Sequence, residues 1–348
     1  MKDIAGDLGV SLMTVSKALR NHSDISEKTR NRVLKRMREL NYQPDWIARS
    51  MVTGRTFVVG LVFPDLMHSF FAEVAKGVTR KLQPLGYQVV ISDTEEDGDV
   101  ELRHVDVLVN RRVDGLIIAS AQRKGRLDLF RMLDRKKIPY VLIDRMLPGV
   151  DANYVGVKDD ELGAMATEHL IAQGCRRVAH IRGPAVATGA GRLRGYRRAL
   201  ARHGITPDPA YITSGQYGDN TGYDAMQKLL AADPQPDGVF CYNDPVAAGA
   251  VKAILETNLR VPEDIAVIGA GNVHYSDLLR VPLSTVDQGS TAIGETATDL
   301  LVKCMDSGQP SPPQHIFIAP RLVVRDSSRR KRSSQQSAIS DRQERAPE

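Results

Sequence analysis

The stretch SLMTVSKALR, residues 11 to 20, decides how the amino-terminal part of this chain folds. Ser11 is a favoured residue at the start of a helix, and Val15 and Leu19 stand one helical turn apart, which predicts a short helix with that pair facing inward. The exposed face of this helix then carries Leu12, Met13, Ser16 and Lys17. Apolar side chains beside a cation on an exposed first turn indicate a surface that contacts another molecule.

Two further helices are expected around this stretch. Before it, Gly9 ends an apolar stripe, so a first helix, a turn and the second helix follow one another. That stripe consists of Ile4, Ala5 and Leu8. After it, Ser26 is the expected cap of a third helix, whose apolar stripe consists of Val33, Leu34, Met37 and Leu40. Three short helices of this kind can enclose one small core.

A helix–turn–helix directs its second helix into the major groove of DNA. The first residues of that helix reach base edges, where an ammonium group can bind guanine O6 and N7 and apolar atoms can contact a thymine methyl. We therefore expect Leu12, Met13 and Lys17 to read bases. As a structural alternative, Leu12 and Met13 would also suit packing against a neighbouring domain.

The charge of the chain is distributed unevenly. The first 56 residues carry 11 Lys and Arg against 6 Asp and Glu, whereas residues 57 to 326 carry a formal charge of −3. A small basic module on a mildly acidic body indicates that the module alone meets a polyanion. Charge by itself would equally fit a solvated surface, so this inference depends on the helices described above.

Two runs carry a family resemblance: DIAGDLGVSLMTVSKAL, residues 3 to 19, and ISEKTRNRVLKRMRELNYQPDWIARSM, residues 25 to 51. They resemble the DNA-binding headpiece of the LacI/GalR family of bacterial transcription regulators. The resemblance implies base contacts by Leu12, Met13 and Lys17. It also implies a set of phosphate contacts, which consists of Ser11, Thr14, Ser16, Ser26, Thr29 and Tyr42. Phosphate contacts position such a module, while base contacts give it sequence preference.

The chain departs from the family pattern at two headpiece positions. Arg20 and Asp45 stand where the family commonly has asparagine. An extra cation at Arg20 can add a phosphate contact. A carboxylate near DNA weakens binding unless it has another role, so we expect Asp45 to cap the helix that follows it.

That next segment, PDWIARSMVTG at residues 44 to 54, predicts one or two helical turns that are marginal alone. The resemblance implies that it folds on operator DNA and that Met51 wedges into the central base step through the minor groove, which costs a few kcal/mol of unstacking. The structural alternative is a plain linker. We therefore assign residues 1 to 43 to the headpiece and 44 to 56 to a hinge helix and linker.

The body of the chain alternates β-rich runs with amphipathic segments. FVVGLVF, YQVVISD, GLIIAS and YVLID come first, followed by VAHIRG, GVFCY and AVIGAG. Buried strands that alternate with helices predict doubly wound parallel sheets in an α/β fold. We expect an effector-binding core at residues 57 to 326 with two lobes, about 57 to 157 and 158 to 285. The remainder, including HIFIAPRLVVRDS, would cross back and close the first sheet.

This body resembles the family's core, which is built like a periplasmic sugar-binding protein. Ligands in such folds bind at the carboxyl ends of strands. The resemblance implies an effector site formed by Phe70, Phe71, Arg145, Thr188, Arg192, Tyr217 and Asp244. We expect aromatic rings to stack on the effector while Arg192 and Asp244 bind its polar edge. Alternatively, the aromatic pair belongs to the core and Arg192 forms an ion pair with Asp244 between the lobes.

The residues that follow VIG affect the expected character of this cleft. Ala270, Gly271 and Asn272 stand where the family usually has an acidic pair, so we expect a cleft less acidic than in typical sugar-binding members. A sugar or related polyol is the first candidate effector. A nucleobase is the second, and an acidic metabolite is a further alternative.

These observations predict a ligand-responsive DNA-binding repressor of a carbohydrate-related operon. We expect a homodimer on a palindromic operator, in the bacterial cytoplasm at the nucleoid, without cofactor, metal or catalytic residue. A transport-associated sugar-binding protein is the first alternative, but MKDIAGDLGV lacks the apolar run of a secretory signal. An α/β enzyme is the second, but no P-loop, metal-ligand cluster or nucleophile with a base partner is evident.

Three remaining features are expected to be structural. Cys175, Cys241 and Cys304 are too far apart for a disulfide framework or a zinc site and predict reduced thiols. No stretch approaches the roughly 20 apolar residues of a membrane span. Residues 327 to 348 are polar without periodicity and predict a disordered basic tail.

Overall fold

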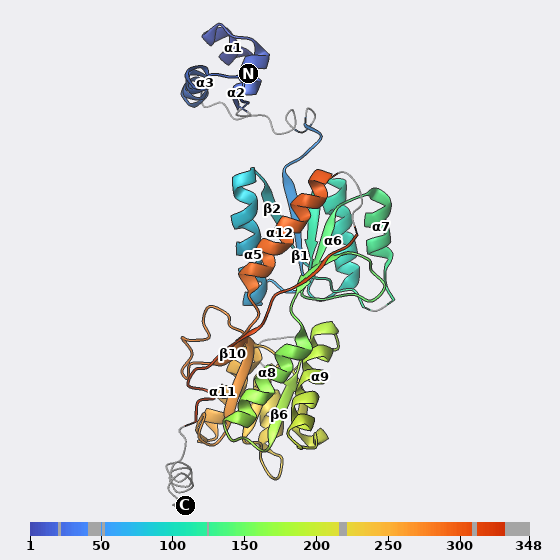
Figure 1. The fold of residues 1–348 in the computed structure, drawn as a ribbon, viewed down its shortest axis with the longest axis vertical. Coiled ribbons are helices and arrows are strands. Elements are labelled where there is room, and N and C mark those ends of the chain that lie inside the picture. Colours follow the sequence, from blue (N-terminus) through green and yellow to red (C-terminus); the bar gives the residue numbers. More distant parts are fainter. Residues whose placement is uncertain are drawn as a thin grey trace, which may run out of the picture. The chain divides into compact units, whose positions relative to one another are not determined.

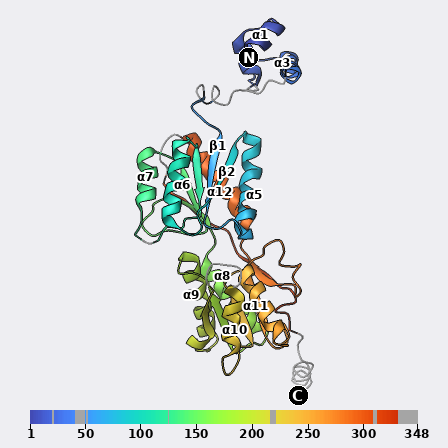
Figure 2. The same cartoon turned by 180° about the vertical axis from the view of Figure 1, so that it is seen from behind.

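The computed structural model describes residues 1–19, 22–40, 50, 53–123, 125–215, 221–307 and 312–330. The chain divides into two compact units, Met1–Phe57 and Val58–Glu348. The first is helical and the second is a two-lobed α/β core (Figure 1 and Figure 2). Within the described residues, no helix is both long and apolar enough to cross a membrane.

The amino-terminal unit contains the three helices that the sequence predicts. They are α1 (Lys2–Leu8), α2 (Leu12–Leu19) and α3 (Glu27–Glu39). The backbone of Gly9 is left-handed, with φ 63°, and ends α1. The Ser11 hydroxyl accepts from the Thr14 amide at 3.0 Å, and the Ser26 hydroxyl accepts from the Thr29 amide at 3.2 Å. Both expected N-caps are therefore present.

The core of this unit is smaller than the predicted stripes. Ile4, Val15 and Val33 are 0% exposed and pack together. Met37, one turn after Val33, is partly buried against them. The prediction was wrong for Leu34 and Leu40, which are 38% and 41% exposed. The stripe of α3 is narrow because its contacts with α1 and α2 cover only the line through residues 33 and 37.

The first lobe contains a parallel sheet. Its strand order is β11 (His315–Phe317), β5 (Asn153–Gly156), β4 (Tyr140–Ile143), β3 (Gly115–Ile118), β1 (Val58–Phe63) and β2 (Gln88–Asp93). The helices of this lobe are α5 (Ser69–Leu82), α6 (Gly98–Asn110), α7 (Asp128–Lys136) and α12 (Ser290–Ser307). Helices α6 and α7 share one apolar cluster with the strands, while α5 packs along α12.

The second lobe repeats this plan. Its strand order is β12 (Arg321–Val323), β10 (Ser284–Asp287), β9 (Ala266–Gly271), β8 (Gly238–Cys241), β6 (Val178–Arg182) and β7 (Ile212–Ser214). β12 is antiparallel to β10. The helices are α8 (Asp159–Ala172), α9 (Ala187–Arg202), α10 (Thr221–Leu230) and α11 (Asp244–Glu256). Short 3₁₀ turns occur at Pro209–Tyr211 in this lobe and at Gln83–Leu85, after α5, in the first lobe.

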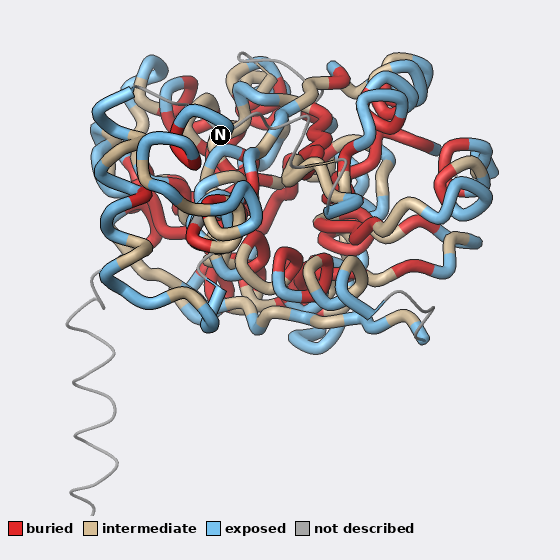
Figure 3. Tube along the Cα trace, turned by 90° about the horizontal axis from the view of Figure 1, so that it is seen from above, coloured by how far each residue is buried: buried red, intermediate tan, exposed pale blue. Residues whose placement is uncertain are grey.

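Buried residues concentrate in the interior of the molecule and exposed residues on its outer turns (Figure 3); the central strands β1, β3 and β4 are almost wholly buried, whereas the edge strand β2 is partly exposed. This distribution is the one expected for two doubly wound parallel sheets. All three cysteines are free, and Cys175 and Cys241 are buried. The expected fold class is confirmed.

The carboxyl-terminal segment differs from the prediction in two ways. Residues 315–317 add β11 to the first sheet as expected, but residues 321–323 return to the second sheet as β12. The tail also cannot begin at 327, since Ser327 and Ser328 are 0% exposed. The Ser327 hydroxyl donates to the Val267 carbonyl at 2.7 Å, and Arg330 donates to the Asp237 carbonyl at 2.6 Å. Residues 331–348 lie outside the described residues.

Candidate functional site

Helix α2 presents the exposed first turn that the sequence predicts. Leu12 is 45% exposed and Met13 is 61% exposed, so neither is used by the core of its own unit. Apolar side chains held on a folded helix start can meet thymine methyl groups in a major groove. The geometry of this turn therefore suits base reading.

Lys17, on the same helix, already has a partner. Its ammonium group lies 2.5 Å from Asp24 Oδ2, and the other oxygen of Asp24 lies 2.8 Å from His22 Nδ1. The hydrogen bond from Lys17 is the largest effect that lowers the pKa of Asp24, and His22 adds to it. Asp24 was not among the predicted functional residues. The sequence feature that could have indicated it is a lone carboxylate in the turn between α2 and α3 of a basic module.

The expected phosphate-binding hydroxyls lie at two helix starts. The hydroxyl oxygens of Ser11 and Thr14 are 2.9 Å apart at the start of α2. Those of Ser26 and Thr29 are 2.9 Å apart at the start of α3. Helix N-termini with exposed amides and hydroxyls suit phosphate groups. Ser16 is half-buried on α2. Other predicted positions, namely Arg20, Tyr42, Asp45 and Met51, lie outside the described residues.

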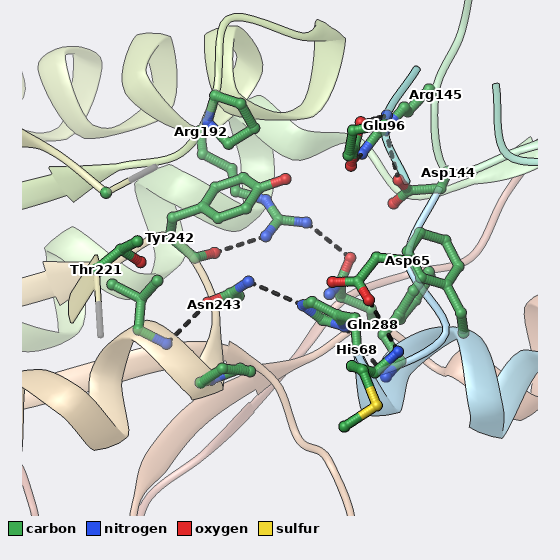
Figure 4. Close-up of a pocket in the computed structure, with 17 residues that line it drawn as sticks. Asp65, His68, Glu96, Asp144, Arg145, Arg192, Thr221, Tyr242, Asn243 and Gln288 are labelled. Atoms are coloured by element: carbon green, nitrogen blue, oxygen red, sulfur yellow. Dashed lines mark hydrogen bonds and ion pairs between the residues drawn. The ribbon is translucent and has the colours of Figure 1, made fainter. Parts of the chain in front are cut away.

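The second candidate site is a cavity of about 150 Å³ that both lobes line (Figure 4). It lies where strands of the two sheets end at their carboxyl ends, as parallel sheets commonly arrange their ligand sites. Of the predicted effector residues, it brings together Phe70, Phe71, Arg145 and Arg192. Polar lining residues that the sequence analysis did not assign are Asp65, His68, Glu96, Asp144, Thr221, Tyr242, Asn243 and Gln288.

Phe70 and Phe71 belong to the core and also form part of the cavity wall. They are 3% and 4% exposed, and the Phe71 ring lies 5.0 Å from the Phe63 ring of β1. Both rings also line the cavity. An aromatic wall that is fixed by the core can stack on a ligand ring with little loss of side-chain entropy.

Arg145 is held by the first lobe. Its two terminal nitrogens donate to the carboxylate oxygens of Glu96, one of them at 2.6 Å, and one also donates to the Ser120 carbonyl at 3.3 Å. Burial opposes the charged form, but the bonds to Glu96 outweigh it and raise the pKa of Arg145. Asp144 Oδ2 lies 3.5 Å from Arg145 Nε.

Arg192 is held by the second lobe in the same manner. Its guanidinium group donates to Asp159 at 2.9 Å, to the Tyr242 carbonyl at 2.6 Å and to Gln288 at 2.8 Å. It also lies 4.7 Å from the centre of the Tyr242 ring. Burial raises the pKa of Asp159 to about 6, against the opposite effect of Arg192. The expected ion pair between Arg192 and Asp244 is therefore wrong, because Asp159 takes that place.

Asp244 does not belong to the cavity lining. It is 0% exposed and accepts from Thr285 at 2.6 Å, Ser276 at 2.7 Å and the Val273 amide at 3.0 Å. Burial raises its pKa despite these bonds. The expectation that Asp244 points at the effector is wrong because Asn243 takes the N-cap of α11 and lines the cavity. Asparagine one residue before Asp-Pro was the available signal.

The remaining predicted residues lie behind or beyond the lining. The Thr188 hydroxyl lies 3.0 Å from the Tyr242 hydroxyl, so it positions that ring from outside the cavity. Tyr217 lies outside the described residues. The cleft is not free of acidic residues, because Asp65, Glu96 and Asp144 line it. These carboxylates come from the first lobe, whereas the expectation of a less acidic cleft considered only residues 270 to 272.

Hydrogen bonds join the two lobes at this cavity. Asn243 Nδ2 lies 2.8 Å from His68 Nε2, and Glu73 accepts from the His274 amide at 2.9 Å (the former is drawn in Figure 4). Burial lowers the pKa of His68 to about 4, so its ring is neutral at physiological pH. The separation of the lobes is thus tied to groups at the edge of the cavity.

Two family models match the chain. The model of bacterial regulatory proteins, lacI family, matches residues 1–45, and that of the periplasmic binding protein-like domain matches residues 167–328. The ribose operon repressor of Escherichia coli (strain K12) is 34% identical over 334 residues, 94% of this chain and 99% of that protein. The HTH-type transcriptional repressor PurR of Haemophilus influenzae (strain PittEE) is 31% identical over 333 residues, 94% and 98% respectively.

Solved structures give the same result. The lac repressor dimer bound to operator and the anti-inducer ONPF matches with a TM-score of 0.81 and 26% identity, over 94% of this chain and 98% of that one. The complex of the transcriptional regulator CelR with cellobiose matches with a TM-score of 0.72 and 30% identity, over 93% and 98%. Both comparisons span the helical unit and the two-lobed core.

Proposed function

The chain belongs to the LacI family of bacterial regulatory proteins, and from this premise we propose how it recognises DNA, an effector and a second copy of itself. It is a ligand-responsive, DNA-binding transcriptional repressor and not an enzyme, since the curated relatives described above are repressors. The observation that carries the proposal is the pairing of an exposed recognition helix with a cavity between two lobes.

For DNA, we propose that α2 reads the major groove of each half of a palindromic operator. Lys17 contacts a guanine, and Leu12 and Met13 contact thymine methyl groups. The phosphate contacts are those of Ser11, Thr14, Ser16, Ser26, Thr29 and Tyr42, and Met51 wedges into the central step. A homodimer supplies the two helices, as in the lac repressor dimer bound to operator. The bacterial cytoplasm, at the nucleoid, is the proposed location.

For the effector, we propose a sugar or related polyol with a single ring. The cavity of about 150 Å³ is smaller than the roughly 300–1,000 Å³ of sites for drug-sized ligands. Phe70 and Phe71 supply a ring-stacking wall, Asp144 supplies an acceptor, and Gln288 supplies an amide. The ribose operon repressor supports a pentose, and the controlled genes would then form a carbohydrate-related operon. A nucleobase is the second candidate, because the same aromatic wall would stack on it.

The test has a DNA arm and an effector arm. Selection from a random duplex pool should enrich one palindrome, and titration should show its affinity falling steeply as salt rises. A thermal-shift screen of monosaccharides, polyols and nucleobases should then find one class that raises the melting temperature and changes operator affinity. Enrichment of no palindrome would contradict the DNA proposal. A response to nucleobases alone would replace the sugar proposal with its alternative.

A further inference from the structure

We infer that the interlobe cavity admits uncharged, hydroxyl-rich ligands and rejects carboxylated or phosphorylated ones, and that Glu96 sets this selectivity by occupying Arg145. The inference deepens the proposed function, since it rests on the cavity being the effector site. The evidence for it is the set of hydrogen bonds that the Arg145 and Arg192 guanidinium groups form within the protein, together with the carboxylates that line the cavity.

Both cations of the cavity are already neutralised by the protein. Arg145 has a 5% exposed side chain and forms a two-pronged ion pair with Glu96. Arg192 has a 2% exposed side chain and bonds Asp159, the Tyr242 carbonyl and Gln288. Two-pronged pairs between a guanidinium and a carboxylate are strong and directional, and they use the same nitrogens that would bind a ligand anion. An incoming anion therefore meets no unpaired guanidinium among the described lining residues.

The charge around the cavity is negative rather than balanced. Its described lining residues include the carboxylates Asp65, Glu96 and Asp144 but only the two guanidinium groups. His68, also a lining residue, is neutral above about pH 5 because burial lowers its pKa to about 4. The local charges thus oppose an anionic ligand.

Asp144 in particular is placed to accept from hydroxyl groups. Its backbone is left-handed, with φ 60°, where a residue with a side chain is uncommon. Its side chain is 12% exposed and lies 3.5 Å from Arg145 Nε. A neutral polyol can donate hydroxyl protons to such a carboxylate. The ionised oxygens of a carboxylate or phosphate group cannot donate in this way and would add a like charge in a site with little water.

Glu96 is the residue on which the selectivity depends. It follows β2 in a turn whose backbone is left-handed at residue 96, with φ 59°, and its amide donates to the Pro64 carbonyl at 2.9 Å. This turn directs its carboxylate at Arg145 rather than at solvent. Without that carboxylate, Arg145 would present its terminal nitrogens to the cavity. In the wild-type chain, by contrast, Glu96 occupies Arg145. The selectivity thus comes from a cation that is unavailable to an anionic ligand.

The experiment compares three variants with wild type, using inorganic phosphate as the anion probe. Glu96→Gln frees Arg145, whereas Asp65→Asn removes the same charge from the cavity but leaves the ion pair in place. The double variant Glu96→Gln, Arg145→Gln removes both members of the pair. Calorimetric titration with phosphate is expected to show no saturable binding to wild type. Glu96→Gln is expected to bind phosphate at least tenfold more tightly than the upper limit that the titration sets for wild type. Asp65→Asn should gain far less phosphate affinity than Glu96→Gln, and the double variant should resemble wild type.

Matched pairs of ligands test the wild-type chain directly. D-Ribose is compared with D-ribose 5-phosphate, and D-glucose with D-gluconate, in thermal-shift titrations. Saturable binding of an anionic member in preference to its neutral partner would overturn the inference. So would saturable phosphate binding to wild type that Arg145→Gln abolishes, an outcome that does not require Glu96→Gln to fold. If no neutral sugar binds but Glu96→Gln gains phosphate, the sugar effector fails while the role of Glu96 stands.

Discussion

At the residue scale, Lys17 is both the proposed guanine contact and a member of an ion pair with Asp24 within the helical unit. Asp24 holds the Lys17 ammonium at 2.5 Å and is itself 46% exposed. In solution such a pair stabilises the fold little. If Lys17 reads a base as proposed, the pair should matter more on DNA, because the carboxylate would orient Lys17 and also repel phosphate groups.

We predict that the two members of this pair have opposite effects on DNA binding. Lys17→Ala should cost roughly 1–3 kcal/mol for each good base contact and relax preference at that base pair. Asp24→Asn should strengthen binding to random DNA and reduce discrimination at the same base pair. Anisotropy titrations on a selected palindrome and on random duplex measure both. Glu39→Gln is the matched control, since it removes the same charge from an exposed ion pair on α3. Equal changes on both DNAs for Lys17→Ala would refute base reading.

Glu101 is a second residue whose environment yields a prediction. It is 0% exposed on α6, accepts from the Ser120 hydroxyl at 2.7 Å and from the Ala121 amide, and so fixes the loop whose carbonyl binds Arg145. Burial raises its pKa from 4.5 to about 7. The folded state therefore holds this proton more tightly than the unfolded state. The contribution of Glu101 to stability is present below pH 4.5 and is lost as pH rises through 7.

Glu101→Gln should remove that pH dependence. The free energy of unfolding of wild type relative to the variant should fall between about pH 4.5 and 7, by on the order of 3 kcal/mol for a pKa shift of this size. Urea unfolding across this range measures the difference. Glu168→Gln, an exposed carboxylate paired with Arg202, is the control and should leave the pH profile unchanged. A profile unaltered by Glu101→Gln would show that Glu101 is ionised throughout.

Sequence reasoning succeeded for residues whose role follows from local spacing and failed where it depends on tertiary neighbours. Ser11 and Ser26 were identified as caps because a cap needs only the residues of its own helix. Asp244 was misplaced because a rotation of one position on α11 moves a side chain by about 100°. Glu96 and Asp159 were missed, since their partners Arg145 and Arg192 are 49 and 33 residues away.

At the element scale, pairs of helices approach closely through glycine. A side chain at Gly77 of α5 would lie 2.3 Å from the Thr291 carbonyl of α12, and one at Gly294 would lie 2.2 Å from the Val74 carbonyl. The same arrangement recurs between α8 and α9, where Gly163 faces the Arg192 backbone. Glycine at these positions is required by contact between backbones rather than by turn geometry.

We predict that Gly163→Ala disturbs the effector site through the backbone of Arg192. The added methyl group would lie 2.3 Å from the Arg192 carbonyl oxygen and 2.8 Å from its Cα, so α9 must move. We expect overpacking to cost roughly 1–3 kcal/mol of unfolding free energy, with weaker effector binding. Calorimetry and thermal unfolding measure the two effects. Gly6→Ala on α1, which meets nothing within 4 Å, is the control and should be neutral or stabilising. Unchanged stability in Gly163→Ala would show that α8 and α9 separate freely.

Most elements were predictable because strand and helix periodicity are local properties. The exceptions are the short strands β5, β7 and β10, which the predicted runs did not include, and the sheet that the last strand joins. Residues 315–317 and 321–323 are two similar short runs, yet they join different sheets with only residues 318–320 between them. Sequence pattern gives the strand character of each run. It does not specify which of two sheets has an open edge to accept it.

At the scale of the whole molecule, the two lobes followed from the repeated α/β alternation, but their mutual contacts did not. His68 and Asn243 are 175 residues apart, and Glu73 and the His274 amide are 201 residues apart. Such contacts exist only once both lobes have folded. We expect them to oppose separation of the lobes, and we expect effector affinity to depend on the population of the joined state.

Glu73 allows this dependence to be tested outside the cavity. Its side chain lies on α5 and accepts from the His274 amide at 2.9 Å and from the Ser290 hydroxyl at 2.8 Å. It is absent from the lining residues of the cavity. Glu73→Ala keeps good helix propensity but removes the bond to the His274 amide, which joins the lobes and is worth about 1 kcal/mol; the bond to Ser290 lies within the first lobe. The variant should therefore spend more time with its lobes apart.

We expect two measurable consequences of Glu73→Ala. Small-angle scattering without ligand should give a larger radius of gyration than wild type. If the joined state alone binds the effector, apparent affinity should fall up to roughly fivefold, because one interlobe bond of about 1 kcal/mol is lost. Lys76→Ala, an exposed change on the same helix, should alter neither. By reciprocity, if the effector changes operator affinity by favouring the joined state, Glu73→Ala should shift operator affinity without ligand in the opposite direction. A variant that scatters and binds like wild type would show that these hydrogen bonds do not control separation of the lobes.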